Sequence, residues 1–261
     1  MKKIIIIFTF IFSLVLLTNC DEDNINCIDE SGDLIEETFE VAEFTGVHVA
    51  NYAKVYVTQQ AEQELTIQAY ESIIQNLLIY VKDKTLVIEN DYCTDQDNPI
   101  IVHIKVPYIN LINLSGSGEI AINPFDNFDD LFISLSGSGD IYSVGDTLEL
   151  DNLVTSISGS GDAEFYLKAD ELDFTISGSG DITPRGIADH QRFIVSGSGN
   201  YYGFDLISRI TDIVISGSGL CEVYTTEELD VKISGSGNVY YKGDPKIISE
   251  ITGSGNIIDS N

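Results

Sequence analysis

Carboxylates recur at one position of this chain, at a spacing that could bring them side by side. Asp140, Asp162 and Asp181 each follow a Ser-Gly-Ser-Gly tetrapeptide and are separated by 22 and 19 residues. If these segments stack as successive coils, the carboxylates form a column at a spacing of about 5 Å. Such close charges repel unless backbone N–H groups, raised pKa values or a cation relieve them, and Ca²⁺ accepts oxygen ligands of this kind. The column predicts either a weak calcium site or carboxylates that only cap turns.

The serines of the tetrapeptides form a second regular set. Alternation along a strand would turn their side chains outward, so stacked coils would present two columns of hydroxyl groups. These columns could hydrogen-bond a glycan or a protein partner, or they could simply keep the corner solvated. Nearby tyrosines could offer flat platforms for sugars or pack on the flank of the solenoid: Tyr142, Tyr166, Tyr201, Tyr202, Tyr224, Tyr240 and Tyr241.

Motifs for catalysis and for nucleotide binding are absent from the sequence. His48, His103 and His190 lie far apart, and a serine without a neighbouring base is not a nucleophile. The Gly-Ser-Gly segments lack the Lys-Ser/Thr of a phosphate loop and the third glycine of a dinucleotide fingerprint. We therefore expect no catalytic residue, no cofactor and no enzyme, and a carbohydrate-active enzyme is the weakest hypothesis.

The charge balance narrows the range of partners. The chain has 13 basic and 42 acidic residues, a net charge of −29. Such a field repels phosphate backbones, so we expect no nucleic-acid partner. It favours basic partners, cations or simple solubility.

The tetrapeptide itself predicts the fold class. Eight copies, the last with Thr in place of the first Ser, recur at intervals of 18 to 22 residues. A period near 20 residues with apolar alternation on both sides is typical of a solenoid. We expect an all-β, single-chain, parallel β-helix-like solenoid with about 18–22 residues per coil. The copies begin at Ser115, Ser136, Ser158, Ser177, Ser196, Ser216, Ser234 and Thr252.

The glycines of the repeat share the parity of the apolar residues, which places them on the inner face or at a tight corner. There, a missing side chain would let the opposite wall approach, or would allow a positive φ. The repeats contain 16 of the 22 glycines, so we predict that these residues specify the fold. They are Gly116, Gly118, Gly137, Gly139, Gly159, Gly161, Gly178, Gly180, Gly197, Gly199, Gly217, Gly219, Gly235, Gly237, Gly253 and Gly255.

The solenoid domain is expected over residues 38–261. Residues 107–261 hold the tetrapeptide coils, and 38–106 read as degenerate first coils and a cap, because Val47–Val57 aligns with Ile112–Ile122 and has Ala-Asn-Tyr-Ala in place of the tetrapeptide. After the last tetrapeptide the sequence shows no amphipathic cap. An uncovered strand edge invites pairing, so we expect end-to-end self-association through the C-terminal coil.

The N-terminus resembles a bacterial lipoprotein signal. Lys2 and Lys3 precede an apolar run that ends in Leu-Thr-Asn-Cys20, so we expect a signal peptide over 1–19, lipidation of Cys20 and membrane attachment through that lipid. Residues 20–37 would form an acidic tether. Its Asp-Glu-Asp-Asn run resembles surface-export signals, which predicts a cell-envelope, outer-membrane lipoprotein exposed at the surface.

Three further cysteines would lie in an oxidising compartment. Cys27 in the tether and Cys93 in a polar loop could form a disulfide that pins the tether to the first coils. Cys221 follows the sixth tetrapeptide and reads as a small buried core residue.

The Ser-Gly-Ser-Gly-Asp-Ile repeats, the phrase Val106-Pro-Tyr-Ile-Asn-Leu-Ile112 and the lipoprotein start together resemble the family described as putative auto-transporter adhesin, head GIN domain. The resemblance covers about residues 39–261. It implies a right-handed β-helix-like fold on a bacterial lipoprotein with an adhesin role. The first hypothesis is therefore a non-enzymatic envelope lipoprotein that presents the solenoid as an adhesin or surface scaffold, with a glycan or a surface protein as partner. The alternative is a glycan-binding module for polysaccharide capture.

Overall fold

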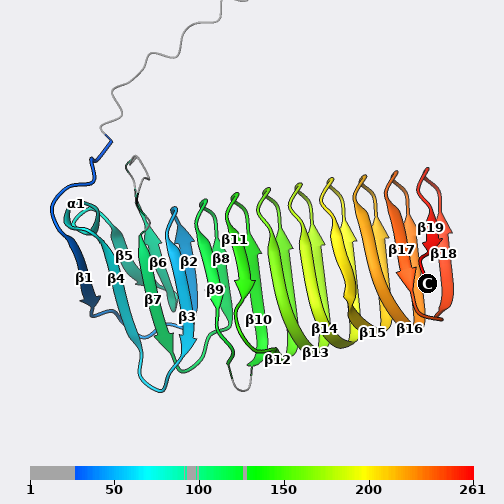
Figure 1. Ribbon diagram of the computed structural model, residues 1–261, viewed down its shortest axis with the longest axis horizontal. Helices are drawn as coiled ribbons and strands as arrows, with labels where there is room; N and C mark the ends of the chain where they lie inside the picture. The colour runs from blue at the N-terminus through cyan, green and yellow to red at the C-terminus, as the bar shows by residue number, and fades with distance from the viewer. Residues whose placement is uncertain (1–26, 91, 93–97, 99, 126–127) are drawn as a thin grey trace, which may run out of the picture.

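Apolar residues at alternate positions place most of this chain in strands that reverse at each tetrapeptide, and the resulting coils stack into a rod (Figure 1). The computed structural model describes residues 27–90, 92, 98, 100–125 and 128–261. The predicted signal peptide, the lipidation site Cys20 and the cysteine Cys93 lie outside these residues.

The described elements are nineteen strands and one short helix. The helix has four residues, and no helix in the described ranges is long and apolar enough to cross a membrane. In chain order the elements are β1 (Leu34–Phe39), β2 (Gly46–Ala50), β3 (Lys54–Gln59), β4 (Glu64–Tyr70), α1 (Glu71–Ile74), β5 (Leu78–Lys82), β6 (Thr85–Glu89), β7 (Ile101–Val106), β8 (Leu111–Leu114), β9 (Glu119–Ile122), β10 (Phe128–Leu135), β11 (Asp140–Ser143), β12 (Leu148–Ile157), β13 (Ala163–Ile176), β14 (Ile182–Val195), β15 (Tyr201–Ile215), β16 (Leu220–Ile233), β17 (Asn238–Lys242), β18 (Lys246–Ile251) and β19 (Ile257–Asp259).

One coil of the rod is a corner, a strand, a bend and a second strand. In β13 the buried positions alternate from Ala163 to Ala169, two exposed residues follow at 170 and 171, and alternation resumes in the opposite phase. The bend at Asp170 therefore divides the coil between two walls. We call wall A the strands that follow a corner, as in residues 163–169, and wall B the strands that precede the next corner, as in 171–176.

Neighbouring repeat coils pair in parallel and in register. Ala163 of β13 lies opposite Ile182 of β14, and Ile176 lies opposite Val195, so that one coil takes 19 residues there. The other repeat coils are offset by 18 to 22 residues, except at Ile207 and Ser208 of β15, where a shift of register reduces the offset to 17. These offsets confirm the parallel solenoid and the predicted coil length.

Large side chains fill the space between the walls. Phe165, Phe174, Phe193 and Tyr201 are fully buried, and the ring of Tyr201 lies 4.5 Å from that of Phe193 and 5.6 Å from that of Phe174, measured between centroids. Each buried side chain of this size stabilises the fold by about 1.5–3 kcal/mol relative to exposure. The alternating pattern thus produces one continuous core along the rod.

β2 and β3 form the first coil, and they pair with β8 and β9 in the register that the sequence alignment predicts. The strands on either side of this coil do not follow chain order. Val47 lies opposite Ile112 and Val55 opposite Ile120. On their other side, β2 and β3 pair in parallel with β6 and β7. The chain therefore leaves the stack after β3, builds an outer coil and returns past it to β8.

Antiparallel strands close the N-terminal end of the rod. β4 pairs antiparallel with β7, β1 with β4, and β5 with β6. β1 begins at Leu34, so this strand overlaps the segment predicted as tether, 20–37.

The glycines of the tetrapeptides are required for a reason that differs from both sequence-based explanations. None of them has a positive φ; the glycines with positive φ lie elsewhere. A Cβ on Gly159 would stand 1.8 Å from the carbonyl oxygen of Gly137, the equivalent glycine of the preceding coil. The close approach is therefore between stacked corners along the rod, not between opposite walls.

Candidate functional site

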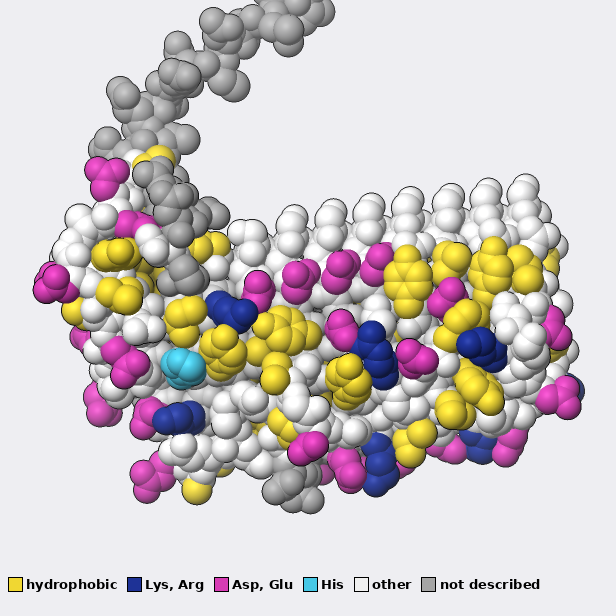
Figure 2. Space-filling model, in the orientation of Figure 1, with side chains coloured by type: hydrophobic (Ala, Val, Ile, Leu, Met, Phe, Trp, Pro, Cys, Tyr) yellow, Lys and Arg dark blue, Asp and Glu magenta, His cyan; other side chains and the backbone are white. Residues whose placement is uncertain are grey.

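The acidic column forms a ladder of hydrogen bonds to the backbone. Oδ1 of Asp140 accepts the N–H of Asp162 at 3.0 Å, and Oδ1 of Asp162 accepts the N–H of Asp181 at 2.8 Å. Asp181 accepts both the backbone and the side-chain N–H of Asn200, at 2.8 and 2.9 Å. Each carboxylate thus caps the start of the next coil. Figure 2 shows the acidic row beside the corners.

This geometry favours the turn-capping interpretation over the calcium one. In each of the three carboxylates one oxygen is already used by the ladder. The described residues contain no group of three or more His, Cys, Asp or Glu side chains arranged to hold a metal ion. Calcium binding by Asp140, Asp162 and Asp181 stays an untested prediction.

Substitutions at Asp162 separate the two interpretations. Asp162→Asn keeps the acceptor oxygen and removes a charge between two like charges, so we expect an equal or higher melting temperature. Asp162→Ala leaves the N–H of Asp181 without its acceptor, and we expect a loss of about 1 kcal/mol. Thermal unfolding with and without Ca²⁺ measures both. A Ca²⁺-dependent rise of the wild-type melting temperature that Asp162→Asn abolishes would instead establish the calcium site.

The serines of the corners point to solvent, as the alternation indicated. Ser158 and Ser160 are exposed, and the corner is held by their backbone N–H groups, which donate to Leu135 and Gly137 at 2.9 and 3.0 Å. Their hydroxyl groups are free to face a partner. The first corner differs, because Nε2 of His48 lies 2.9 Å from Oγ of Ser115.

Ser115 therefore has a neighbouring base, which the wide spacing of the histidines in the sequence did not indicate. The pair resembles the first two members of a nucleophilic triad, which needs a third group to orient the base. No described hydrogen bond holds the other ring nitrogen of His48. The comparison of β2 with β8 could have revealed the pair, since it already placed His48 beside the strand that leads into Ser115.

Aromatic side chains are segregated to the outer surface of wall A. Of the seven tyrosines near the repeats, Tyr201 is buried in the core and Tyr241 packs against it. The other five point outward from wall A, whereas among the described residues of the repeat coils wall B presents one such ring, Phe132. We call this surface the aromatic face. It comprises Tyr142, Tyr166, Tyr202, Tyr224 and Tyr240, together with Phe204.

Cations lie on rings of wall A. The guanidinium of Arg185 is 5.3 Å from the ring centroid of Tyr166, and the Lys242 ammonium is 4.3 Å from that of Phe204. Cation–π contacts of this kind contribute about 0.5–1 kcal/mol at exposed sites. Figure 2 shows basic and hydrophobic side chains interspersed with acidic ones on the face that it presents. Each contact places a cation against an outward ring of wall A.

At the N-terminal side of the aromatic face, Lys54, Glu119 and Tyr142 form a polar cluster. Nζ of Lys54 lies 2.9 Å from Oε2 of Glu119, and the Tyr142 hydroxyl donates to the same oxygen at 3.2 Å. The hydrogen bond between Lys54 and Glu119 raises the pKa of Lys54 and lowers the pKa of Glu119. Partial burial raises the pKa of Tyr142. The cluster stays charged at neutral pH and orients the Tyr142 ring.

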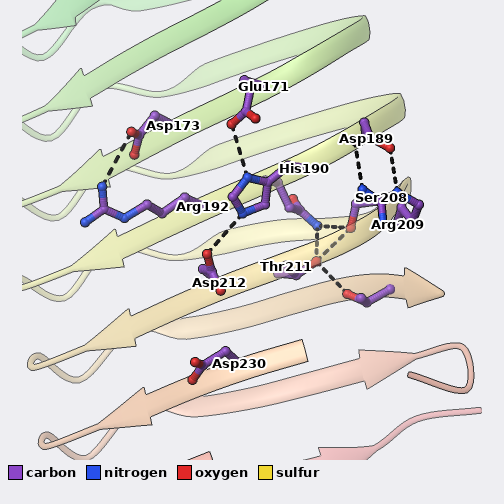
Figure 3. Close-up of polar contacts among 12 residues, drawn as sticks. Glu171, Asp173, Asp189, His190, Arg192, Ser208, Arg209, Thr211, Asp212 and Asp230 are labelled. Atoms are coloured by element: carbon purple, nitrogen blue, oxygen red, sulfur yellow. Dashed lines mark hydrogen bonds and ion pairs between the residues drawn. The ribbon is translucent and has the colours of Figure 1, made fainter. Parts of the chain in front are cut away.

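Wall B carries a row of polar side-chain pairs that link neighbouring coils (Figure 3). His190 lies between Glu171 and Asp212, with ring nitrogens 3.1 and 3.0 Å from their carboxylates. Arg192 is 3.7 Å from Asp173. Exposed pairs of this kind contribute about 0–1 kcal/mol each. These side chains pair with one another across coils, so they are less available to hydrogen-bond a ligand on wall B.

The interior of the rod contains a hydrogen-bonded network that the sequence analysis did not identify (Figure 3). Gln191 Nε2 donates to Ser208 at 2.8 Å and to Thr211 at 3.0 Å, and its carbonyl accepts the hydroxyl of Tyr201. Thr211 also contacts Thr225 at 2.6 Å. All five side chains are buried. The strand alternation in the sequence places these polar residues at inward positions, and this signal could have revealed the network.

The structure describes two of the four cysteines, Cys27 and Cys221. Cys221 is a free, fully buried thiol, and burial raises its pKa well above the usual value, so the thiol is neutral and unreactive. Cys27 is disulfide-bonded. Its predicted partner, Cys93, lies outside the described residues, so this pairing stays a prediction.

Comparison with known proteins places these features in a family. A crystal structure titled putative lipid binding protein, from Parabacteroides distasonis, is 26% identical, with a TM-score of 0.84 and coverage of 90% of this chain and 99% of that one. Crystal structures titled putative adhesin, from Parabacteroides distasonis and Parabacteroides merdae, are 22% and 20% identical, with TM-scores of 0.80 and 0.81; each covers 90% of this chain, and 100% and 99% of its own. They show the same fold. No protein with a curated description matches in sequence.

The match at family level rests on the repeats themselves. The family model described as putative auto-transporter adhesin, head GIN domain, aligns with residues 43–245. That range contains the first coil, the acidic ladder and seven of the eight tetrapeptides. The chain therefore belongs to the putative auto-transporter adhesin, head GIN domain family.

Proposed function

We propose that the protein is a non-enzymatic, lipid-anchored adhesin of the bacterial cell surface, and that the aromatic face of wall A is its contact surface. The family description supports a role in adhesion. The Cys20 box and the acidic run behind it support an outer-membrane lipoprotein exposed to the medium. The rod would then be a rigid spacer with its N-terminal end toward the membrane.

The segregation of aromatic rings to one wall is the observation that carries this proposal. Outward tyrosines are not needed for the core, because inward residues fill the rod. Tyrosine supplies a large contact area with a polar end and loses little conformational entropy on binding, which is why it is enriched in binding surfaces. An array of such rings on a rigid wall suits a large, extended partner better than a small molecule.

Capture of a neutral glycan is the second candidate function. Tyr202 and Tyr240 stand two coils apart on wall A, about 10 Å along the rod, and each lies two residues after an asparagine that directly follows a tetrapeptide. Flat rings beside rows of amide and hydroxyl groups fit the two faces of a sugar chain. The net charge of −29 disfavours an anionic polysaccharide.

A glycan and matrix-protein array tests both candidates with the chain from residue 21 onward. The test variant is the triple substitution Tyr142→Ala, Tyr202→Ala and Tyr240→Ala, and the matched control is Phe132→Ala on wall B. We expect the triple variant to lose at least tenfold in affinity for whatever ligand the array reveals, since central aromatic contacts cost about 2 kcal/mol when truncated.

The control should bind as the wild type does. Equal binding by all three proteins would reject the aromatic face as the contact surface. Labelling of Ser115 by a fluorophosphonate probe would contradict the non-enzymatic part of the proposal.

A further inference from the structure

The C-terminal coil exposes residues that every preceding coil buries. Ile247 and Ile251 of β18 occupy the same inward columns as Leu229 and Ile233 of β16. Leu229 and Ile233 are 0% and 1% exposed, whereas Ile247 and Ile251 are 40% and 43% exposed. The core of the rod is therefore open to solvent at this end in the described structure.

The backbone at this end is also open. β18 pairs in parallel with β16, and β19 pairs with β17. In the described part of the chain no further strand pairs with the outer edge of either one. A strand edge with apolar inward side chains is a template for another strand. The opposite end of the rod, by contrast, is closed by β1, β4, β5 and α1 (Figure 1).

A second copy of β18 fits this edge by its own sequence. Antiparallel pairing about a two-fold axis through Ser249 would place Ile247 of each copy opposite Ile251 of the other and close both cores at once. Lys246 of one copy would lie diagonal to Glu250 of the other, which is attractive. A head-to-tail contact would instead oppose β18 to the antiparallel end, where β1 carries Glu36 and Glu37.

We propose that two copies pair end to end through β18, and that this pairing is homotypic adhesion. The inference rests on the proposed anchoring at Cys20. β18 and β19 lie at the opposite end of the rod from β1 (Figure 1). Two rods joined at these C-terminal ends point their anchored ends in opposite directions, so the pair would bridge two surfaces rather than cluster on one.

Sedimentation of residues 20–261 with Cys20→Ser, which prevents lipidation, tests the pairing in solution. We expect a concentration-dependent dimer. Ile247→Lys with Ile251→Lys places charges on the inward edge, and we expect this variant to weaken dimerisation at least tenfold. The control is Ile187→Lys, at a side chain 51% exposed beside the bend between the walls, which should leave the dimer intact.

Circular dichroism melting verifies that each variant is folded. A wild type that stays monomeric up to about 1 mM, or a dimer that survives the double variant, would overturn the pairing.

Beads coated with the protein through its N-terminus test the bridging. We expect wild-type and Ile187→Lys beads to clump and the double-variant beads to stay dispersed. Dimers in solution without clumping of wild-type beads would overturn homotypic adhesion. The ligand array is independent of both results, because it tests binding by the aromatic face of wall A. If the beads clump but the array shows no binding that depends on the tyrosines, only the aromatic face is rejected as a contact surface.

Discussion

Gly159→Val is expected to prevent the repeat coils from stacking and to lower the free energy of unfolding by more than about 4 kcal/mol. The new Cβ would lie 1.8 Å from the carbonyl oxygen of Gly137 and 2.7 Å from that of Ser136. These atoms are backbone and cannot rotate away. Relief requires that the two corners separate, which breaks the hydrogen bond from the Ser160 N–H to Gly137. Soluble yield and thermal melting measure the effect.

Two controls isolate the close approach as the cause. Ser158→Ala and Ser160→Ala change exposed side chains of the same corner, and we expect each to alter stability by no more than about 0.5 kcal/mol. Gly253→Val makes the same kind of clash, 1.9 Å from the Gly235 oxygen, but in the last coil. Because solenoid coils contact only their neighbours, this variant should fray one end and leave the rest folded.

Serine variants more disruptive than Gly159→Val would show that the glycines are not the fold-specifying part of the repeat. A Gly253→Val protein as damaged as Gly159→Val would show that the coils do not stack independently.

The repeat architecture was predictable because its signals are local and repeated. Alternation across the tetrapeptide indicated which residues point inward, and the period indicated the register of each coil on the next. The placement of β6 and β7 outside β2 and β3 was not predictable. Strands with the same apolar pattern can exchange places in a parallel stack, and nothing in their own residues records which neighbour each one takes.

The candidate surfaces were predictable only in part, for a related reason. The position of Tyr142 and Tyr202 in the strand alternation shows that each side chain points outward. Which of the two walls carries it depends on where the chain bends. The bend at Asp170 carries no glycine or proline to mark it. The acidic column was visible in the sequence, but its role depends on whether a carboxylate oxygen reaches the N–H of the next coil, which spacing alone does not determine.

Gln191→Leu is expected to destabilise the C-terminal half of the rod by about 1–3 kcal/mol although leucine is a better core residue by composition. The substitution removes the acceptor of the Tyr201 hydroxyl, which is fully buried. Burial raises the pKa of Tyr201 well above its usual value, so the group stays a neutral hydroxyl that needs a partner. Ser208 and Thr211 lie 2.7 Å apart and keep each other as partners without Gln191.

A double-mutant cycle with Tyr201→Phe tests this account. Tyr201→Phe alone leaves the Gln191 carbonyl without its donor, and we expect a cost similar to that of Gln191→Leu. In the double variant neither the Tyr201 hydroxyl nor the Gln191 carbonyl remains. Its loss of unfolding free energy should therefore be smaller than the sum of the two single losses by more than about 1 kcal/mol.

Denaturant unfolding monitored by circular dichroism gives the four values. Additive losses would mean that the two side chains act separately. The polar residues would then be tolerated in the core of the rod rather than required as a network, and a fully apolar column in these coils should be as stable as the natural one.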